Sequence, residues 1–258
     1  MEQGKLFNLV GAMLIVFATA LHIVCLVTPH FSEADCHDVF RDKVWQKLRH
    51  SVSDPGNIST STEPVTENGL NRSTGPDYEF YINKINFGLW ELCFLFVRQE
   101  AEVDICTKWS SETIYNSDTK DLDSIGSKGW TRAAQAMAII GTLMAFMGIT
   151  LAIVNMLVKS KGDRQRLIHI FIASGCFATG GFLLLGNFIV AANYKDAIVL
   201  PDDPGVYPPL VQFQEILRDH SFLSWGFALD VVAFALSMLA GVAHLIGGRI
   251  VNIENGIV

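Results

Sequence analysis

The chain has 258 residues, of which 50% are hydrophobic and 17% are charged, whereas a soluble domain normally carries about a quarter charged residues. Its formal net charge is −7 and the sequence has no basic stripe, which excludes a nucleic-acid-binding role because phosphates need cations to neutralise them. The excess of apolar residues points to a membrane protein.

Four long apolar stretches account for this excess. They cover about residues 7–27, 133–158, 167–191 and 222–246, and each reaches the ~20 residues that cross a hydrocarbon core of ~30 Å. The first stretch contains a small-x-small sequence of the kind at which signal peptides are cleaved, but its apolar run is longer than the usual core of a signal peptide. We expect an all-α membrane protein, with four uncleaved transmembrane helices in a left-handed antiparallel four-helix bundle.

The charges of the loops predict the orientation. The short connection at residues 159–166 carries four cations and one anion, which the positive-inside rule places in the cytoplasm. Both termini are then cytoplasmic, and the connections at about residues 29–131 and 193–221 lie outside the cell. We therefore expect a multi-pass protein of the plasma membrane.

The first outer connection contains two acceptor sites for N-linked glycans, Asn57 and Asn71. Both lie in a run rich in Ser, Thr, Asn, Pro and Gly, at about residues 51–77. This run has too few large apolar side chains to offset the entropy lost on ordering. We expect a flexible, glycosylated insert.

The rest of the first outer connection predicts a small extracellular antiparallel β-sheet. Residues 78–97 are rich in aromatic and β-branched side chains, which is typical of strands. Cys93 and Cys106 bracket a segment that can turn at about residues 99–100, and a tight hairpin there sets the two cysteines opposite each other, within reach of a disulfide. We expect this disulfide, and one further strand at about residues 197–200 from the second outer connection.

The other three cysteines have different surroundings. Cys25 and Cys176 fall inside predicted helices, where a small apolar packing role is expected. Cys36 is left over in an outer loop. It can be a free buried thiol, an intermolecular link or a competitor for the hairpin disulfide, and the sequence leaves these alternatives open.

The sequence Gly88, Leu89 and Trp90, followed by Cys93 and Cys106, resembles the first-loop signature of a tetraspan superfamily. This superfamily contains the claudins, peripheral myelin protein, the epithelial membrane proteins and the calcium-channel γ-subunits. The resemblance covers nearly the whole chain apart from the insert, and it implies a single claudin-like domain over residues 1–258. It also implies that the five signature residues anchor the outer sheet on the bundle.

The resemblance implies two functions. One is a non-enzymatic cell-junction or adhesion protein whose outer loops contact copies of itself, and the other is a γ-like accessory subunit of an ion channel or receptor. Phe31 stands where the claudin signature has its first tryptophan. Another aromatic ring at this position can still anchor at the membrane interface, but the change weakens the expectation of a claudin-like barrier function. The acidic residues near the hairpin tip, Glu100, Glu102 and Asp104, are typical of a solvated face.

No motif for catalysis, cofactor binding or metal binding is visible, so an intramembrane enzyme is disfavoured. The expected partners are membrane lipid and either a second copy or another membrane protein.

Asp230 is an acidic residue well inside a predicted helix, where an unpaired charge costs about 2.5 to 3.5 kcal/mol. It lies about 12 Å below the outer end of the fourth helix, and His22 lies about 8 Å below that of the first, at 1.5 Å per residue. The two helices are neighbours in a cyclic antiparallel bundle. We hypothesise that His22 and Asp230 pair; the alternative is that Asp230 bonds to a water or a hydroxyl group and His22 merely packs.

Overall fold

The structure of the protein is a computed structural model that describes residues 3–35, 80–98, 101–110, 114–116, 121–124, 126–157, 163–196, 198–199 and 218–254. Long helices make up most of this part of the chain. They are α1 (Gln3–Val27), α4 (Gly129–Leu157), α5 (Asp163–Asn193) and α7 (Trp225–Glu254). A turn of 3-10 helix, η2 (Tyr194–Asp196), follows α5.

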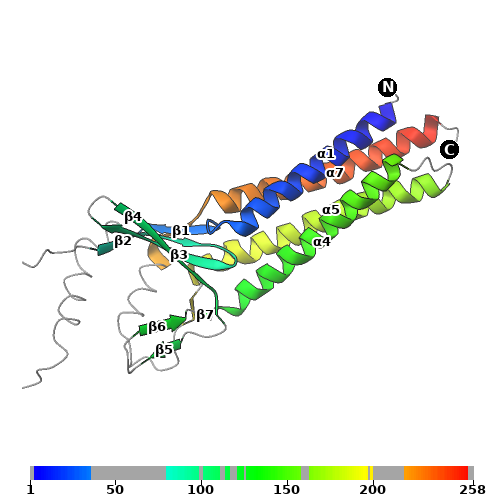
Figure 1. Ribbon diagram of the computed structural model, residues 1–258. Coiled ribbons are helices and arrows are strands. Elements are labelled where there is room, and N and C mark those ends of the chain that lie inside the picture. The colour runs from blue at the N-terminus through cyan, green and yellow to red at the C-terminus, as the bar shows by residue number, and fades with distance from the viewer. Residues whose placement is uncertain are drawn as a thin grey trace, which may run out of the picture.

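These four helices are long and apolar enough to cross a membrane, which confirms the predicted class of protein. The shortest, α1, has 25 residues, or about 37 Å at 1.5 Å per residue. The helices run antiparallel, and the first turn of α1 and the last turn of α7 lie at the end of the bundle away from the strands (Figure 1). The predicted bounds differ most at α7, which begins after a short strand rather than at residue 222 and continues well beyond residue 246.

The helices form a ring in which α1 packs on α4, α4 on α5, α5 on α7 and α7 on α1, as predicted. Their contact faces consist of small side chains. The buried residues of α4 recur every three or four positions, and none is larger than threonine: Thr131, Ala134, Ala138, Gly141, Ala145, Gly148 and Ala152. Large apolar side chains of the same helix are exposed, among them Leu143, Phe146 and Leu157. This distribution is typical of transmembrane bundles, where small residues let helices approach each other and lipid surrounds the large ones.

A five-stranded antiparallel sheet stands at one end of the bundle, with the strand order β4-β3-β2-β1-β9 (Figure 1). Its strands are β1 (Ser32–Asp35), β2 (Phe80–Phe87), β3 (Glu91–Arg98), β4 (Ala101–Lys108) and β9 (Ser221–Leu223). β1 follows directly after α1, and β9 leads into α7. β1 lies between β2 and β9, with Ser32 opposite both Phe87 and Leu223. The sheet is therefore connected through β1 to α1 and through β9 to α7.

The strand predicted at about residues 197–200 is not part of this sheet. There, β8 (Ile198–Val199) pairs with β7 (Gly126–Ser127) in a separate two-stranded sheet, and the second outer connection contributes β9 to the main sheet instead. The prediction was right about the strand and its pairing with the first outer connection but wrong about the sheet it joins. The β-branched residues gave the local signal for β8, whereas β9 is determined by its place beside β1. A further pair joins β5 (Ile114–Asn116) to β6 (Asp121–Ser124).

Candidate functional site

Gly88 makes the turn between β2 and β3 and lies against the chain just beyond α1. A Cβ atom at this position would stand 2.7 Å from the Cα atom of Pro29 and 3.1 Å from the carbonyl oxygen of Glu91. The Gly88 N–H donates a hydrogen bond to that same oxygen at 2.8 Å. Because a side chain would collide with the backbone, glycine lets the sheet sit directly on the exit of α1.

The next two residues of the signature turn have different environments. Leu89 is buried in a cluster at the sheet end of the bundle that also contains Cys25, Phe31, Ala134, Ala138 and Val190. Trp90 is 38% exposed, so its indole can lie at a membrane interface. The carbonyl oxygens of Gly88 and Leu89 accept hydrogen bonds from Trp109 Nε1 at 3.1 Å and from Gln135 Nε2 at 2.8 Å. These bonds tie the turn to the end of β4 and to α4.

Phe31 stands where the signature has its first tryptophan, and it is buried in the same cluster. Its N–H donates to the carbonyl oxygen of Phe87 at 2.9 Å, and its own carbonyl oxygen accepts from the N–H of Ser224 at 3.1 Å. The aromatic ring at this position therefore packs inside the protein, between the sheet and the bundle.

Cys93 and Cys106 lie opposite each other on β3 and β4 and form a disulfide, which confirms the prediction. The register pairs Arg98 with Ala101, on either side of the turn predicted at about residues 99–100, which lie outside the described residues. Cys25 and Cys176 are free and buried within α1 and α5, as expected of packing residues. Cys36 lies outside the described residues.

Glu91 lies close to both sulfur atoms of this disulfide, and in the described part of the chain these three side chains are the one close group of potential metal ligands. Metals bind the thiolate form of cysteine, and the two sulfur atoms are bonded to each other. The group therefore offers a single carboxylate, which is too few ligands for a metal centre.

The glycan acceptors Asn57 and Asn71 lie outside the described residues, as does Glu100 at the hairpin tip. Glu102 belongs to β4, and Asp104 is exposed on the same strand, in keeping with a solvated face.

Glu33 in β1 is buried at the seam between the sheet and the bundle although it carries a carboxylate. The Lys84 ammonium of β2 and the Ser224 hydroxyl, which precedes α7, both donate hydrogen bonds to it, and His30 Nδ1 lies 3.2 Å from its Oε1 atom. The His30 ring packs at a centroid distance of 5.1 Å on the ring of Trp225. This cluster joins β1, β2 and the start of α7. The sequence does not reveal this cluster, because an acidic residue after an apolar stretch is too common to identify a buried one.

The contacts of Glu33 determine its pKa. Burial acts to raise the pKa of this carboxyl, but the hydrogen bond and charge of Lys84, the Ser224 hydroxyl and His30 together hold the pKa below its ordinary value. A carboxyl with a lowered folded-state pKa stabilises the fold above its unfolded pKa of about 4.3, and this contribution is lost as the pH falls through the folded pKa. We expect the melting temperature of the wild-type protein to drop below about pH 4.3, and that of Glu33→Gln to depend less on pH in this range.

Melting curves of the purified protein in mild detergent, recorded at a series of pH values, measure this difference. At neutral pH, Glu33→Gln should melt several degrees below the wild type because the amide is a weaker acceptor for Lys84. Asp104→Asn, which changes an exposed carboxylate on β4, is the matched control and should keep the wild-type profile. Equal pH profiles for the wild type and Glu33→Gln would contradict the expected role of this carboxylate.

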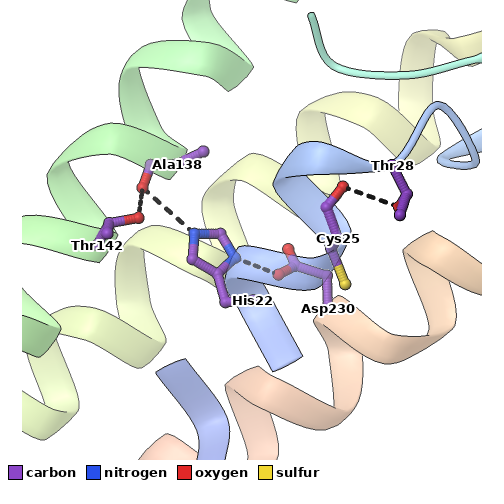
Figure 2. Close-up of polar contacts among 6 residues, drawn as sticks. All are labelled: His22, Cys25, Thr28, Ala138, Thr142 and Asp230. Atoms are coloured by element: carbon purple, nitrogen blue, oxygen red, sulfur yellow. Dashed lines mark hydrogen bonds and ion pairs between the residues drawn. The ribbon is translucent and has the colours of Figure 1, made fainter. Parts of the chain in front are cut away.

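His22 of α1 and Asp230 of α7 come together in the half of the bundle nearer the sheet, and both are buried (Figure 2). His22 Nδ1 lies 2.5 Å from Asp230 Oδ1, and the other ring nitrogen, Nε2, lies 3.3 Å from the carbonyl oxygen of Ala138 on α4. The same carbonyl accepts a hydrogen bond from Thr142 Oγ1 at 2.8 Å. The two residues singled out by depth in the sequence thus lie within hydrogen-bond reach, and their contacts connect three helices.

The two acceptors around the His22 ring determine how many protons the pair holds. The carbonyl oxygen of Ala138 cannot donate, so Nε2 must carry a proton to bond to it. A second proton must then lie between Nδ1 and Asp230, on one side or the other. In either arrangement the pair as a whole is neutral, which avoids the cost of an unpaired charge in hydrocarbon.

The apolar helices, the glycine-led turn and the disulfide hairpin together define a claudin-like tetraspan membrane protein. Comparison with known families agrees: residues 16–246, most of the chain, match the family described as PMP-22/EMP/MP20/Claudin tight junction. The chain belongs to this family, whose members are known as non-enzymatic structural or junction proteins. No individual curated protein matches the chain.

Proposed function

We propose that this protein is a non-enzymatic plasma-membrane protein that acts in cell junctions or adhesion through its outer loops. The whole chain forms one domain, both termini are cytoplasmic, and the sheet faces the outside of the cell. The four cations of residues 159–166 support this orientation, because such loops are retained in the cytoplasm. Membership of the claudin family supports a second copy or another membrane protein as the partner.

The observation that carries this proposal is the outer edge of β4. This strand is the last of its sheet, and no other strand of the described chain pairs with its free side. The backbone groups at such an edge can bind a strand from another chain. Because the disulfide joins β4 to β3 and the signature turn is bonded to α4, the edge is held in a fixed orientation on the bundle.

Two exposed charges on β4 suit pairing with a second copy of the same strand. Asp104 and Lys108 are four positions apart, so they lie on one face of the strand. When two β4 strands pair antiparallel about Cys106, Asp104 of each copy lies opposite Lys108 of the other. Each such pair of opposite charges contributes roughly 0.2 to 1 kcal/mol. A second copy therefore fits this edge.

Charge reversal tests the proposed pairing. Cells that lack adhesion proteins should aggregate when they express the wild-type protein, and differently tagged copies should co-purify. Asp104→Lys and Lys108→Asp each place like charges opposite each other between identical copies, so each alone should weaken both readouts. Mixing or co-expressing the two variants restores opposite charges, so both readouts should recover.

Lys195→Asp, a reversal of an exposed charge away from β4, is the matched control and should behave as the wild type. The proposal fails when the two single reversals have no effect, or when the mixture of variants does no better than either alone.

A second function, as an accessory subunit of a channel or receptor, is favoured by the outer face of α5. Ser174, Ala178 and Gly181 recur there at helical spacing, and a Cβ atom at Gly181 would meet nothing within 4 Å. Small residues on an outward face let a helix of another protein approach closely. Purification from native membranes in mild detergent distinguishes the two functions, because a stoichiometric channel partner supports this one.

The proposed orientation also predicts glycosylation of the first outer loop. Treatment with an N-glycosidase should increase the electrophoretic mobility of the wild-type protein, because glycans attach only to sequons that reach the secretory lumen. The double variant Asn57→Gln/Asn71→Gln should migrate like the deglycosylated protein and show no further change. Persistence of the mobility change in the double variant would contradict the assigned sites.

A further inference from the structure

Asn187 is a buried polar residue of α5 that has no partner within the described protein. Its side chain is 4% exposed, and neither its amide nitrogen nor its amide oxygen makes a hydrogen bond within the described residues. Leaving an amide unbonded in an apolar environment is costly, so nearly all buried amides are bonded to protein or to water.

A cavity of about 10 Å³ adjoins this amide. Three of its lining side chains are polar, namely His22, Asn187 and Asp230, and they come from three different helices. The remainder of the lining is apolar and includes Leu89 and Leu183. A space of this size is about the minimum that holds one water molecule.

We propose that this cavity binds a single water molecule that bridges the Asn187 amide and the Asp230 carboxyl group. Asp230 uses Oδ1 for His22, and no other bond of its carboxyl group is found among the described residues. The water receives from and donates to these two groups, which gives it the polar partners that a buried water needs. With Ala138 bound to His22, the polar cluster then joins α1, α4, α5 and α7.

The charge of the site favours water over a cation. The His22 and Asp230 pair holds one proton at its shared contact and one on Nε2, which faces the Ala138 carbonyl oxygen, so the pair is neutral as a whole. A monovalent cation would therefore add an uncompensated charge, since Asp230 is the one acidic residue that lines the cavity. A neutral ligand of one heavy atom avoids that cost.

A second cavity gives this water a route to the sheet end of the protein. It measures about 20 Å³ and shares Phe31, Leu89 and Val190 with the first, so these three side chains stand between the two spaces. The hydroxyl group of Thr131 lines this second cavity and is likewise buried without a partner in the described chain. The second cavity thus carries a polar group on the side of the sheet.

Radiolytic labelling of the wild-type protein in ¹⁸O-water tests the proposal. Hydroxyl radicals formed from a bound water modify the side chains beside it even when bulk solvent does not reach them. Leu183, which lines the cavity and is 2% exposed, should take up ¹⁸O several-fold more than Ile172, a fully buried aliphatic residue of the same helix. Equal labelling of Leu183 and Ile172 would overturn the proposal.

Asn187→Leu tests the role of the amide, because it removes both hydrogen-bonding groups and fills part of the cavity. Labelling of Leu183 should then fall to the level of Ile172. Thr179→Val is the matched control on α5, since it removes a buried hydroxyl that bonds to its own helix at Gly175 and does not line the cavity. Undiminished labelling in Asn187→Leu would show that Asn187 does not hold the water, and the wild-type comparison stands even if this variant does not fold.

Discussion

Replacing Cys93 and Cys106 together with serine is expected to destabilise the outer hairpin by about 3 kcal/mol. The two cysteines are 13 residues apart, and closing a loop of about that length stabilises a fold by about 3 kcal/mol in the chain-entropy model. A sheet that is one layer thick has little core to compensate. Amide hydrogens of β3 and β4 should therefore exchange about a hundredfold faster, since each 1.4 kcal/mol corresponds to a factor of ten.

Hydrogen exchange followed by mass spectrometry in nanodiscs measures this effect by segment. The double variant is used because a single replacement would leave an unpaired thiol free to react with other cysteines such as Cys36. Cys176→Ser, which changes a buried cysteine of α5, is the control and should leave exchange in β3 and β4 unchanged. Unchanged exchange in the double variant would mean that packing against the bundle, rather than the disulfide, maintains the hairpin.

The bundle and the hairpin were predictable because their signals are local. An apolar run of helix length can satisfy its backbone groups in a membrane only as a helix or within a barrel, so four such runs specify four helices. In the hairpin, cysteines placed about evenly on either side of a short turn must lie opposite each other, and the observed register pairs Cys93 with Cys106.

The two strands that adjoin the helices, β1 and β9, were not predictable, because their pairing is set at long range. β1 has four residues and β9 has three, and neither shows a clear alternation of apolar and polar side chains. They pair because β1 extends α1, β9 precedes α7, and these two helices pack together. The contact therefore follows from the assembled bundle and has no pattern of its own in the sequence.

The buried polar residues differ in how far the sequence constrains them. Asp230 lies in a predicted helix, where the cost of an unpaired charge requires a partner and the depth of the residue limits the candidates to few. Glu33 lies beyond the first apolar stretch, where a charge needs no partner until the sheet covers it. Asn187 is neutral, so burying it costs less than burying a charge and the sequence does not require a partner for it. The structure adds the cavity that this side chain lines.

Asp230→Leu is expected to destabilise the folded bundle by about 3 kcal/mol, the cost of breaking a buried, hydrogen-bonded pair by removing one partner. The leucine leaves His22 Nδ1 without its hydrogen-bond partner at 2.5 Å. Asp230→Asn should cost less, about 1 kcal/mol, because the amide N–H can still donate a hydrogen bond to Nδ1 of the ring while Nε2 keeps its proton for the Ala138 carbonyl oxygen. The rank order of stability is therefore wild type, then Asp230→Asn, then Asp230→Leu. Thermal melting in nanodiscs and the fraction of protein that reaches the cell surface both measure this order.

A double-mutant cycle separates this pairing from a general effect of leucine on α7. When both His22 and Asp230 become leucine, the buried polar groups disappear together, so the double variant should be more stable than Asp230→Leu alone.

His169 provides the control, since it is a buried histidine on α5 near the opposite end of the bundle, in contact with the backbone region of Gly248. His169→Leu should add to Asp230→Leu without coupling, because distant sites act independently. If the losses of stability in His22→Leu and Asp230→Leu simply add, the two side chains lie together without stabilising each other. The register of α1 and α7 would then be fixed by the close packing of Gly4 and Gly11 on α7 alone.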